Sequence, residues 1–163
     1  MTLDDAMTLS DDAFVERYSG LFEHSPWIVE RAAARRPFPD LHAGLMQVVA
    51  DAGVEDQLRL IRAHPELAGK AAIDQALTAE STAEQASAGL DRLTEAEFER
   101  FHRLNAAYRD TFGFPFIICV RKTDKAGILT AMESRLHHDR ETELRVALAE
   151  IGEIVRLRLE DME

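Results

Sequence analysis

An apolar run at positions 112–120, Phe-Gly-Phe-Pro-Phe-Ile-Ile-Cys-Val, is the feature that most constrains how this chain can fold. Gly113 and Pro115 lie two residues apart inside it and exclude an ordinary helix. Because Pro115 disfavours helical geometry for Phe114, the run is expected to be extended and, from its composition, buried. Its backbone groups then need hydrogen-bond partners, which protein, water or a ligand can supply. The run is therefore either a buried connector or the wall of a ligand site.

Composition limits the classes of protein to consider. A length of 163 residues fits one domain, residues 1–163, and an apolar content of 46% is enough for a core. The chain has 30 acidic and 19 basic residues, which gives a formal charge of −11. This charge repels phosphate backbones and no basic stripe is evident, so no nucleic acid is expected as a partner.

Location is predicted from the cysteine content and the two ends of the chain. The single cysteine cannot form an internal disulfide, and no cysteine pair has zinc spacing, which indicates a reduced compartment. The first residues are acidic and lack the apolar core of a signal peptide, and no apolar run is long enough to cross a membrane. Residues 161–163 do not form a peroxisomal signal. We expect a cytoplasmic protein with no membrane association.

Helix caps followed by apolar residues at helical spacing recur along the chain. In the first part they predict helices from Ser10 to about Gly20, from Ser25 to before Pro37, from Asp40 to a stop at Gly53, and from Val54 to His64.

Two capping-box signatures open the second part of the chain. Ser81 with Glu84 predicts a helix at 82–88, and Thr94 with Glu97 opens a helix that ends at Gly113. Two more helices are expected from Asp124 and from about Glu141, with a break near Asp139 between them. With no repeat, low-complexity segment or linker, the predicted fold class is all-α, a single-domain helical bundle around a buried extended segment.

Three features have both a structural and a functional interpretation. His64 precedes Pro65 at a helix end, where it is either presented for chemistry or is a partly exposed histidine that the helix dipole favours as a cation. The Ser81 and Glu84 pair is either part of a site or only a capping box. Arg158 continues an apolar stripe formed by Leu144, Leu148, Ile151 and Val155. It must therefore reach solvent, pair with a buried carboxylate or face a cavity that holds an anion.

Metal and thiol chemistry have weaker support. His64 with Glu66, or His137 with His138, suggests a metal, but adjacent histidines point apart on a helix and no third ligand is suitably spaced. A nucleophilic Cys119 paired with His64 is an alternative to an inert buried thiol, which the apolar neighbours favour.

Several motifs, in order, resemble the OHCU decarboxylase family, whose substrate is 2-oxo-4-hydroxy-4-carboxy-5-ureidoimidazoline (OHCU). They span nearly the whole chain. They comprise residues 19–27, the His-Pro motif at 61–70, the Leu-Thr-Ala-Glu-Ser stretch at 77–81 with Glu84-Gln85 and 88–90, Leu104-Asn105 with Tyr108, residues 112–119, Glu133–Leu136 and 157–159. The step at 137–139 departs from the pattern, since an amide is expected near His138.

The resemblance implies an all-helical, usually dimeric enzyme that uses no metal or organic cofactor. By position in the motifs, it implies His64, Glu84 and Arg158 as catalytic residues. The implied substrate contacts are Pro65, Ser81, Gln85 and the backbone groups of Phe116, Ile117, Ile118, Cys119 and Val120.

The implied reaction is decarboxylation of OHCU to (S)-allantoin in urate degradation. His64 is then the acid or polarising group, Glu84 orients the ureido and ring nitrogens, and Arg158 with the backbone amides holds the anion. Two alternatives stay open: a helical interaction module with a groove around 114–120, and a relative that acts on another carboxylated ureide.

Overall fold

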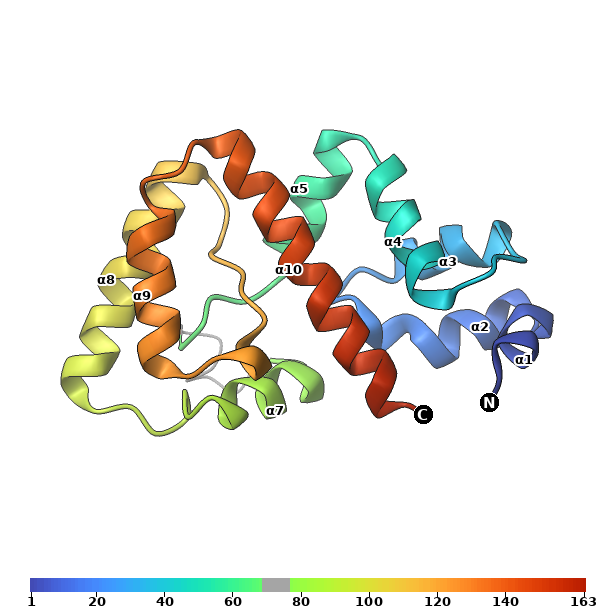
Figure 1. The fold of residues 1–163 in the computed structure, drawn as a ribbon, viewed down its shortest axis with the longest axis horizontal. Helices are drawn as coiled ribbons and strands as arrows, with labels where there is room; N and C mark the ends of the chain where they lie inside the picture. Colours follow the sequence, from blue (N-terminus) through green and yellow to red (C-terminus); the bar gives the residue numbers. More distant parts are fainter. Residues whose placement is uncertain (69–76) are drawn as a thin grey trace. The chain divides into compact units, whose positions relative to one another are not determined.

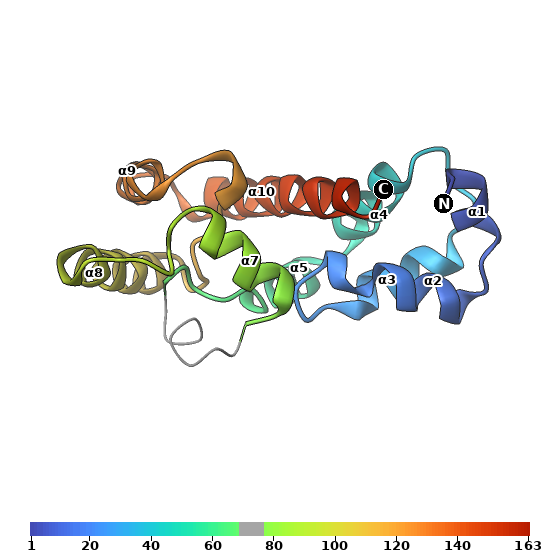
Figure 2. The same cartoon turned by 90° about the horizontal axis from the view of Figure 1, so that it is seen from below.

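The computed structural model describes residues 1–68 and 77–163, which form helices and connecting segments (Figure 1, Figure 2). No strand occurs within these two ranges, so the predicted all-helical fold class is confirmed. The chain divides into two compact units, Met1–Ala63 with Gly152–Glu163 as unit 1 and His64–Ile151 as unit 2. That residues 1–163 act as one domain stays a prediction.

Unit 1 is built from short helices in which α2 packs on α3 and α3 packs on α4. Its elements are α1 (Leu3–Thr8), α2 (Asp11–Tyr18), the 3₁₀ turn η1 (Ser19–Leu21), α3 (Pro26–Ala34), α4 (Leu41–Asp51), α5 (Val54–Arg62) and the end of α10 (Arg140–Asp161).

The capping predictions in unit 1 are largely confirmed. Ser10 and Asp40 are the N-caps of α2 and α4, and each side chain accepts a hydrogen bond from the third helical amide. Ser25 precedes α3 as predicted but makes no cap bond, because its hydroxyl donates to the Glu23 carbonyl instead. Gly53 does not end α4 in a left-handed conformation. It is the extended N-cap of α5.

A helix that the sequence did not predict opens the chain. Thr2 and Asp5 form a capping box for α1, with the Thr2 hydroxyl accepting from the Asp5 amide and the Asp5 carboxylate accepting from the Thr2 amide. The helix spans only six residues and buries only Ala6, so its apolar periodicity was too weak to read.

Unit 2 contains the longer helices and the apolar segment. Figure 1 shows α8 and α9 lying side by side, with the segment running beside α9 as a trace without helix. The elements are α7 (Ala79–Ser87), α8 (Glu95–Phe112), the 3₁₀ turn η2 (Val120–Lys122), α9 (Lys125–Arg135) and the beginning of α10.

The ends of α8 and α9 agree with prediction. Thr94 and Glu97 form a capping box at the start of α8, and Asp124 caps α9. Gly113 ends α8 in the left-handed region with φ of 81°, a conformation that glycine adopts without a steric penalty.

The predicted start of α7 is wrong. Thr78, not Ser81, is the N-cap, and its hydroxyl accepts the amide hydrogen of Ser81 at 3.2 Å. The helix therefore begins at Ala79, three residues earlier than predicted. Ser81 and Glu84 lie inside it and do not form a capping box, which removes the structural interpretation offered for that pair.

The buried face of α10 differs in part from the predicted stripe. Ile151, Val155 and Arg158 are buried as predicted, but Leu144 and Leu148 are only half-buried. The fully buried positions in the first turns are Glu143 and Ala147, one residue earlier in each case. A carboxylate at Glu143 is tolerated because other polar side chains of unit 2 surround it, as described below.

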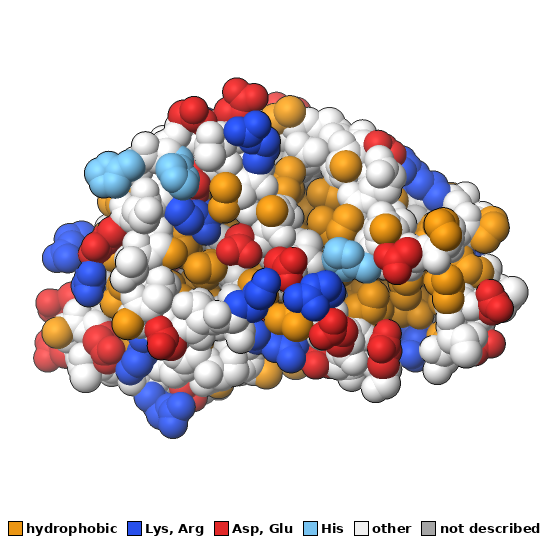
Figure 3. Space-filling model, viewed as in Figure 1, with side chains coloured by type: hydrophobic (Ala, Val, Ile, Leu, Met, Phe, Trp, Pro, Cys, Tyr) orange, Lys and Arg blue, Asp and Glu red, His pale blue; other side chains and the backbone are white. Residues whose placement is uncertain are grey.

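The surface agrees with the mixed charge of the sequence. On the face shown in Figure 3, acidic and basic side chains are interspersed among apolar ones. Among the residues placed by the structure, no helix is both long and apolar enough to span a membrane.

Candidate active site

The apolar segment at 114–119 is an irregular and largely buried stretch of unit 2. It has no helical assignment, and Phe114, Phe116 and Cys119 are each only 1% exposed. Ile118 is half-buried, whereas its neighbours Ile117 and Cys119 are buried. The segment leads into η2, which lies against α7. Its backbone therefore passes beside the helix that carries Ser81, Glu84 and Gln85.

Aromatic packing holds the side chains of this segment. The ring of Tyr108 on α8 meets Phe116 edge-on with centroids 5.3 Å apart and meets Phe114 at 6.0 Å. These distances lie in the favourable range for aromatic pairs. The alternate residues of the segment are thus anchored on α8, which leaves its backbone to be placed by polar contacts.

Helix α7 presents two buried polar side chains one turn apart, Ser81 and Gln85. Glu84 lies between them in sequence and is half-buried. Burial raises the pKa of the Cys119 thiol, and the negative charges of Glu150 and Glu84 raise it further. Ser81, Glu84 and Gln85 all lie on the helix that η2, the turn at the end of the apolar segment, packs against.

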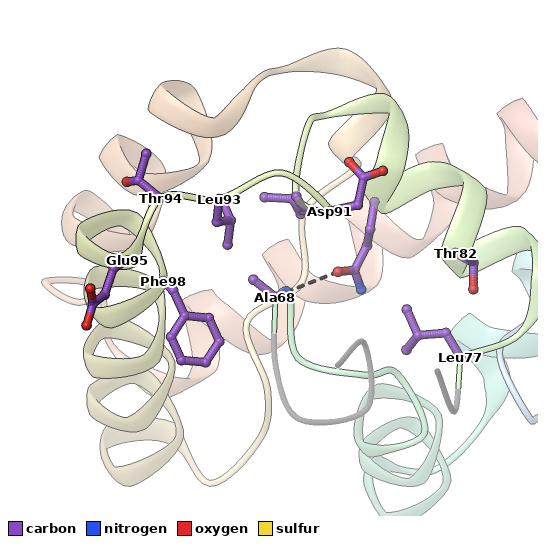
Figure 4. Close-up of a pocket in the computed structure, with 10 residues that line it drawn as sticks. Ala68, Leu77, Thr82, Asp91, Leu93, Thr94, Glu95 and Phe98 are labelled. Atoms are coloured by element: carbon purple, nitrogen blue, oxygen red, sulfur yellow. Dashed lines mark hydrogen bonds between the residues drawn. The ribbon is translucent and has the colours of Figure 1, made fainter. Parts of the chain in front are cut away.

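The loop that follows His64 is tied to two helices. Asn105 on α8 donates from its side-chain amide to the Leu67 carbonyl at 2.8 Å. The side-chain oxygen of Gln85 on α7 accepts the Ala68 amide at 3.0 Å, as the dashed line in Figure 4 shows. Ala68 has φ of 53°, a left-handed conformation that a non-glycine residue adopts only where its surroundings favour it.

Glu66 in the same loop pairs with Arg109, one turn beyond Asn105 on α8. His64 itself is buried, at 8% exposed. It is therefore not the partly exposed histidine of the structural interpretation, and Glu66 has a partner other than a metal ion.

A cavity of about 580 Å³ lies beside this loop (Figure 4). Among the predicted site residues Gln85 borders it. The remaining lining is mostly apolar, from Leu77, Leu90, Leu93 and Phe98, and includes the acidic residues Asp91 and Glu95. Among its described residues the lining has no basic side chain, so this cavity offers a carboxylated substrate no opposite charge.

Arg158 belongs to unit 1, where its guanidinium is 5% exposed. It donates to the Gly20 carbonyl at 3.1 Å, to the Leu21 carbonyl at 3.5 Å and to the Glu23 carboxylate at 3.5 Å. Glu23 is 1% exposed. Of the three arrangements considered for Arg158, the structure shows the pair with a buried carboxylate.

Thiol and metal chemistry gain no support. A raised pKa keeps Cys119 as the neutral thiol, whereas a nucleophile needs the thiolate. Within residues 1–68 and 77–163, no group of three or more His, Cys, Asp and Glu side chains is arranged to hold a metal ion.

Comparison with known proteins decides the family. The family model for OHCU decarboxylase matches residues 7–160. The chain belongs to the OHCU decarboxylase family. It is 44% identical to the 2-oxo-4-hydroxy-4-carboxy-5-ureidoimidazoline decarboxylase of Haloferax volcanii, over 98% of this chain and 94% of that protein. It is 37% identical to the Mus musculus decarboxylase of the same name, over 91% of this chain and 85% of that protein.

Two solved structures have a similar fold. A crystal structure of (S)-allantoin synthase superposes with a TM-score of 0.74 at 30% identity, covering 99% of this chain and 54% of that one. A crystal structure of OHCU decarboxylase in the presence of (S)-allantoin superposes with a TM-score of 0.69. At 20% identity, the second likeness supports the fold alone.

The sequence analysis missed several polar residues that contact the predicted site residues or the segments around them. Asn105 holds the loop after His64, Glu23 pairs with Arg158, and Arg135 with Glu143 forms a buried pair. Each is a polar side chain beside apolar neighbours, and that contrast was the available signal. Asn105 follows the buried Leu104 on α8, and Arg135 is the last residue of α9, directly before Leu136.

Proposed function

We propose that this chain decarboxylates OHCU to (S)-allantoin in urate degradation. The match of the OHCU decarboxylase model to residues 7–160 carries the proposal. The loop after His64 and the buried segment beside α7 support it, because hydrogen bonds and packing within unit 2 hold both stretches.

The chemistry suits a site made of side chains and backbone groups. In OHCU the carboxylate and a hydroxyl share carbon C4, and the next ring carbon, C5, carries the ureido group and is double-bonded to nitrogen. When the bond between C4 and the carboxylate breaks, carbon dioxide leaves, its electron pair forms a C4=C5 double bond, and the C5=N electrons move to the nitrogen, which takes up a proton. The product is the enol of allantoin, with its oxygen on C4. Loss of the proton from that oxygen and addition of one proton to C5 then give allantoin. The protein must supply donors for the developing negative charge, a site from which water is excluded, and a proton delivered to one face.

The proposed roles follow from residue type and burial. His64, buried at the end of α5, donates the proton or polarises the carbonyl. Glu84 accepts hydrogen bonds from the ureido and ring nitrogens, and Ser81, Gln85 and Pro65 complete the substrate contacts. The amides of 116–120, together with Arg158, hold the anion. No cofactor takes part in this scheme, and the homodimer and the cytoplasmic location stay predictions.

The test uses OHCU generated freshly from urate. Because OHCU decays unaided to racemic allantoin, an active protein is expected to accelerate its disappearance and to produce optical rotation from excess (S)-allantoin. Heat-denatured protein is the control. A decay rate equal to that of the control, with a racemic product, would contradict the proposal. A change in rate with a different product would favour a relative that acts on another carboxylated ureide.

The interaction-module alternative has less support. It requires an open apolar groove around 114–120, but most of this segment is buried in unit 2, with Phe114 and Phe116 each 1% exposed. A partner helix needs exposed apolar side chains to dock on.

Glu84→Gln is expected to lower kcat/KM for OHCU strongly while changing stability little. Because Thr78 caps α7, Glu84 has no capping role to lose, and the amide has the same shape as the carboxylate. Loss of one electrostatic contact in a transition state typically costs about 10²–10³-fold. Steady-state kinetics and thermal unfolding measure the two effects. Glu80→Gln, at an exposed position of the same helix, is the control, and an unchanged kcat/KM in Glu84→Gln would remove the proposed role.

Asn105→Asp is expected to lower both stability and activity. The change replaces the donor to the Leu67 carbonyl with a carboxylate oxygen in a site that is 3% exposed. Leaving a buried acceptor unpaired costs about 1–3 kcal/mol, and a 1 Å displacement of a catalytic group can lower the rate about 10²-fold. Thermal unfolding and kcat/KM test this, with Glu99→Gln on the exposed face of α8 as the control. Wild-type kinetics would show that the loop after His64 does not depend on Asn105.

A further inference from the structure

A buried cluster of charged and polar side chains contacts the apolar segment. Arg135 and Glu143 are 7% and 0% exposed, and the Arg135 Nε donates to Glu143 Oε1 at 2.8 Å. The Tyr108 hydroxyl donates to the same oxygen at 2.6 Å, and His138 Nδ1 lies 2.8 Å from Oε2. Glu143 is thus neutralised and hydrogen-bonded on both oxygens, which a buried carboxylate requires.

One contact leads from this cluster to the segment. The Nη1 of Arg135 donates to the Ile117 carbonyl at 2.7 Å. The guanidinium carbon also lies 4.3 Å from the centroid of the Phe116 ring, a cation–π distance. Nη2 is buried without a hydrogen-bond partner among the described residues, and the neighbouring ring face compensates part of that loss. Arg135 therefore holds both the side chain of Phe116 and the backbone of Ile117.

Fixing the Ile117 carbonyl also fixes the direction of the next amide. In a trans peptide the C=O of one residue and the N–H of the following residue point to opposite sides of the chain. The N–H of Ile118 must therefore point away from Arg135. Ile118 is also the half-buried residue between the buried Ile117 and Cys119. The segment has no regular helix or strand hydrogen bonds that would fix the orientation of the peptide group between Ile117 and Ile118. The hydrogen bond from the Arg135 side chain fixes it instead.

We propose that Arg135 is a positioning residue that acts through the Ile117 carbonyl to aim the Ile118 N–H at the anionic substrate. The proposal rests on the proposed function, because it takes the amides of 116–120 as the donors to the substrate. A preoriented donor stabilises developing charge without reorganising during the reaction. Its direction also helps to decide which face of the planar enolate lies against the segment, and hence which enantiomer of allantoin forms.

A lysine cannot replace Arg135 in this role. The guanidinium uses Nε for Glu143 and Nη1 for Ile117, two donors held in one plane, and it stacks on Phe116. A lysine ammonium is a point charge on a flexible stem and has no planar fork. Arg135→Lys thus keeps a positive charge to pair with Glu143 but loses the fixed hydrogen bond to the Ile117 carbonyl.

The main test compares Arg135→Lys with Tyr108→Phe. Tyr108→Phe removes a hydrogen bond to the same Glu143 oxygen but leaves the contact with Ile117 in place. On fresh OHCU, Arg135→Lys is expected to lower kcat/KM by about 10²-fold, as for a misplaced transition-state contact. It is also expected to reduce the enantiomeric excess of (S)-allantoin. Tyr108→Phe is expected to keep the wild-type enantiomeric excess and kcat/KM. A purely structural role of the cluster would affect both variants alike.

A second measurement does not depend on turnover. Adding (S)-allantoin is expected to shift the amide resonance of Ile118 in the wild-type protein and in Tyr108→Phe, but not in Arg135→Lys. If Arg135→Lys does not fold, the double variant Arg135→Gln with Glu143→Gln removes both buried charges and the contact with Ile117, and the same losses are expected from it.

The outcomes separate this proposal from the proposed function. A wild-type protein that does not act on OHCU would contradict the function itself. An active wild type would overturn the role of Arg135 if the folded variant kept the wild-type kcat/KM, enantiomeric excess and Ile118 shift.

Discussion

Replacing His64 with alanine is expected to reduce turnover of OHCU by about 10²–10⁴-fold, the usual contribution of a general acid or base. The histidine is buried at the end of α5, and the loop that follows it is held by Asn105 and Gln85. Because those contacts involve the backbone of Leu67 and Ala68, they survive the substitution. The variant is therefore expected to remain folded, and far-ultraviolet circular dichroism checks this alongside the kinetics.

His137→Ala is the matched control, since this histidine is exposed between α9 and α10. It is expected to keep wild-type turnover. If the folded His64→Ala variant turned over fresh OHCU at the wild-type rate, His64 would have no catalytic role.

Replacing Arg158 with lysine is expected to lower kcat/KM by an amount worth about 2–4 kcal/mol, in the range for loss of one electrostatic stabiliser. Only a guanidinium can hold a carboxylate or carbonyl pair with two parallel N–H donors. The substitution keeps a positive charge near Glu23, so the buried carboxylate still has a counterion. The loss is thus expected mainly in activity, measured by steady-state kinetics, and less in thermal stability.

Arg156 provides the control for Arg158 on the same helix. Its guanidinium is more exposed and pairs with Glu153 and Glu160 of α10. Such surface pairs contribute little, so Arg156→Lys is expected to be nearly silent. Equal small effects of both substitutions on kcat/KM would contradict the proposed role of Arg158. A lower melting temperature with unchanged kinetics in Arg158→Lys would show that its function is to pair with Glu23.

The sequence predicted those elements whose signals are local. The caps at Ser10, Asp40, Thr94 and Asp124 are confirmed, because a cap depends on residues three or four positions apart. The predicted start of α7 failed for the same local reason. Thr78 and Ser81 are both suitable caps and lie three positions apart, and the spacing of apolar residues does not choose between them.

The sequence motifs also identified the family, and the helical spacing of apolar residues predicted that Arg158 is buried. The site residues were inferred from the same motifs, and their roles stay predictions. The sequence did not reveal which polar side chains pair with those residues. Asn105 bonds to Leu67 across 38 positions, and Arg158 meets Glu23 across 135.

Only the tertiary structure decided these pairings. A buried polar side chain is stable where a partner of matching geometry reaches it, and helix packing brings that partner from a distant part of the chain. Glu143 shows this most clearly. Its neighbours in sequence predicted that Leu144 would face inward, but the contacts with Arg135 and Tyr108 place the carboxylate there instead. Helical periodicity sets which residues share a face, whereas the partners available inside the fold determine which face is buried.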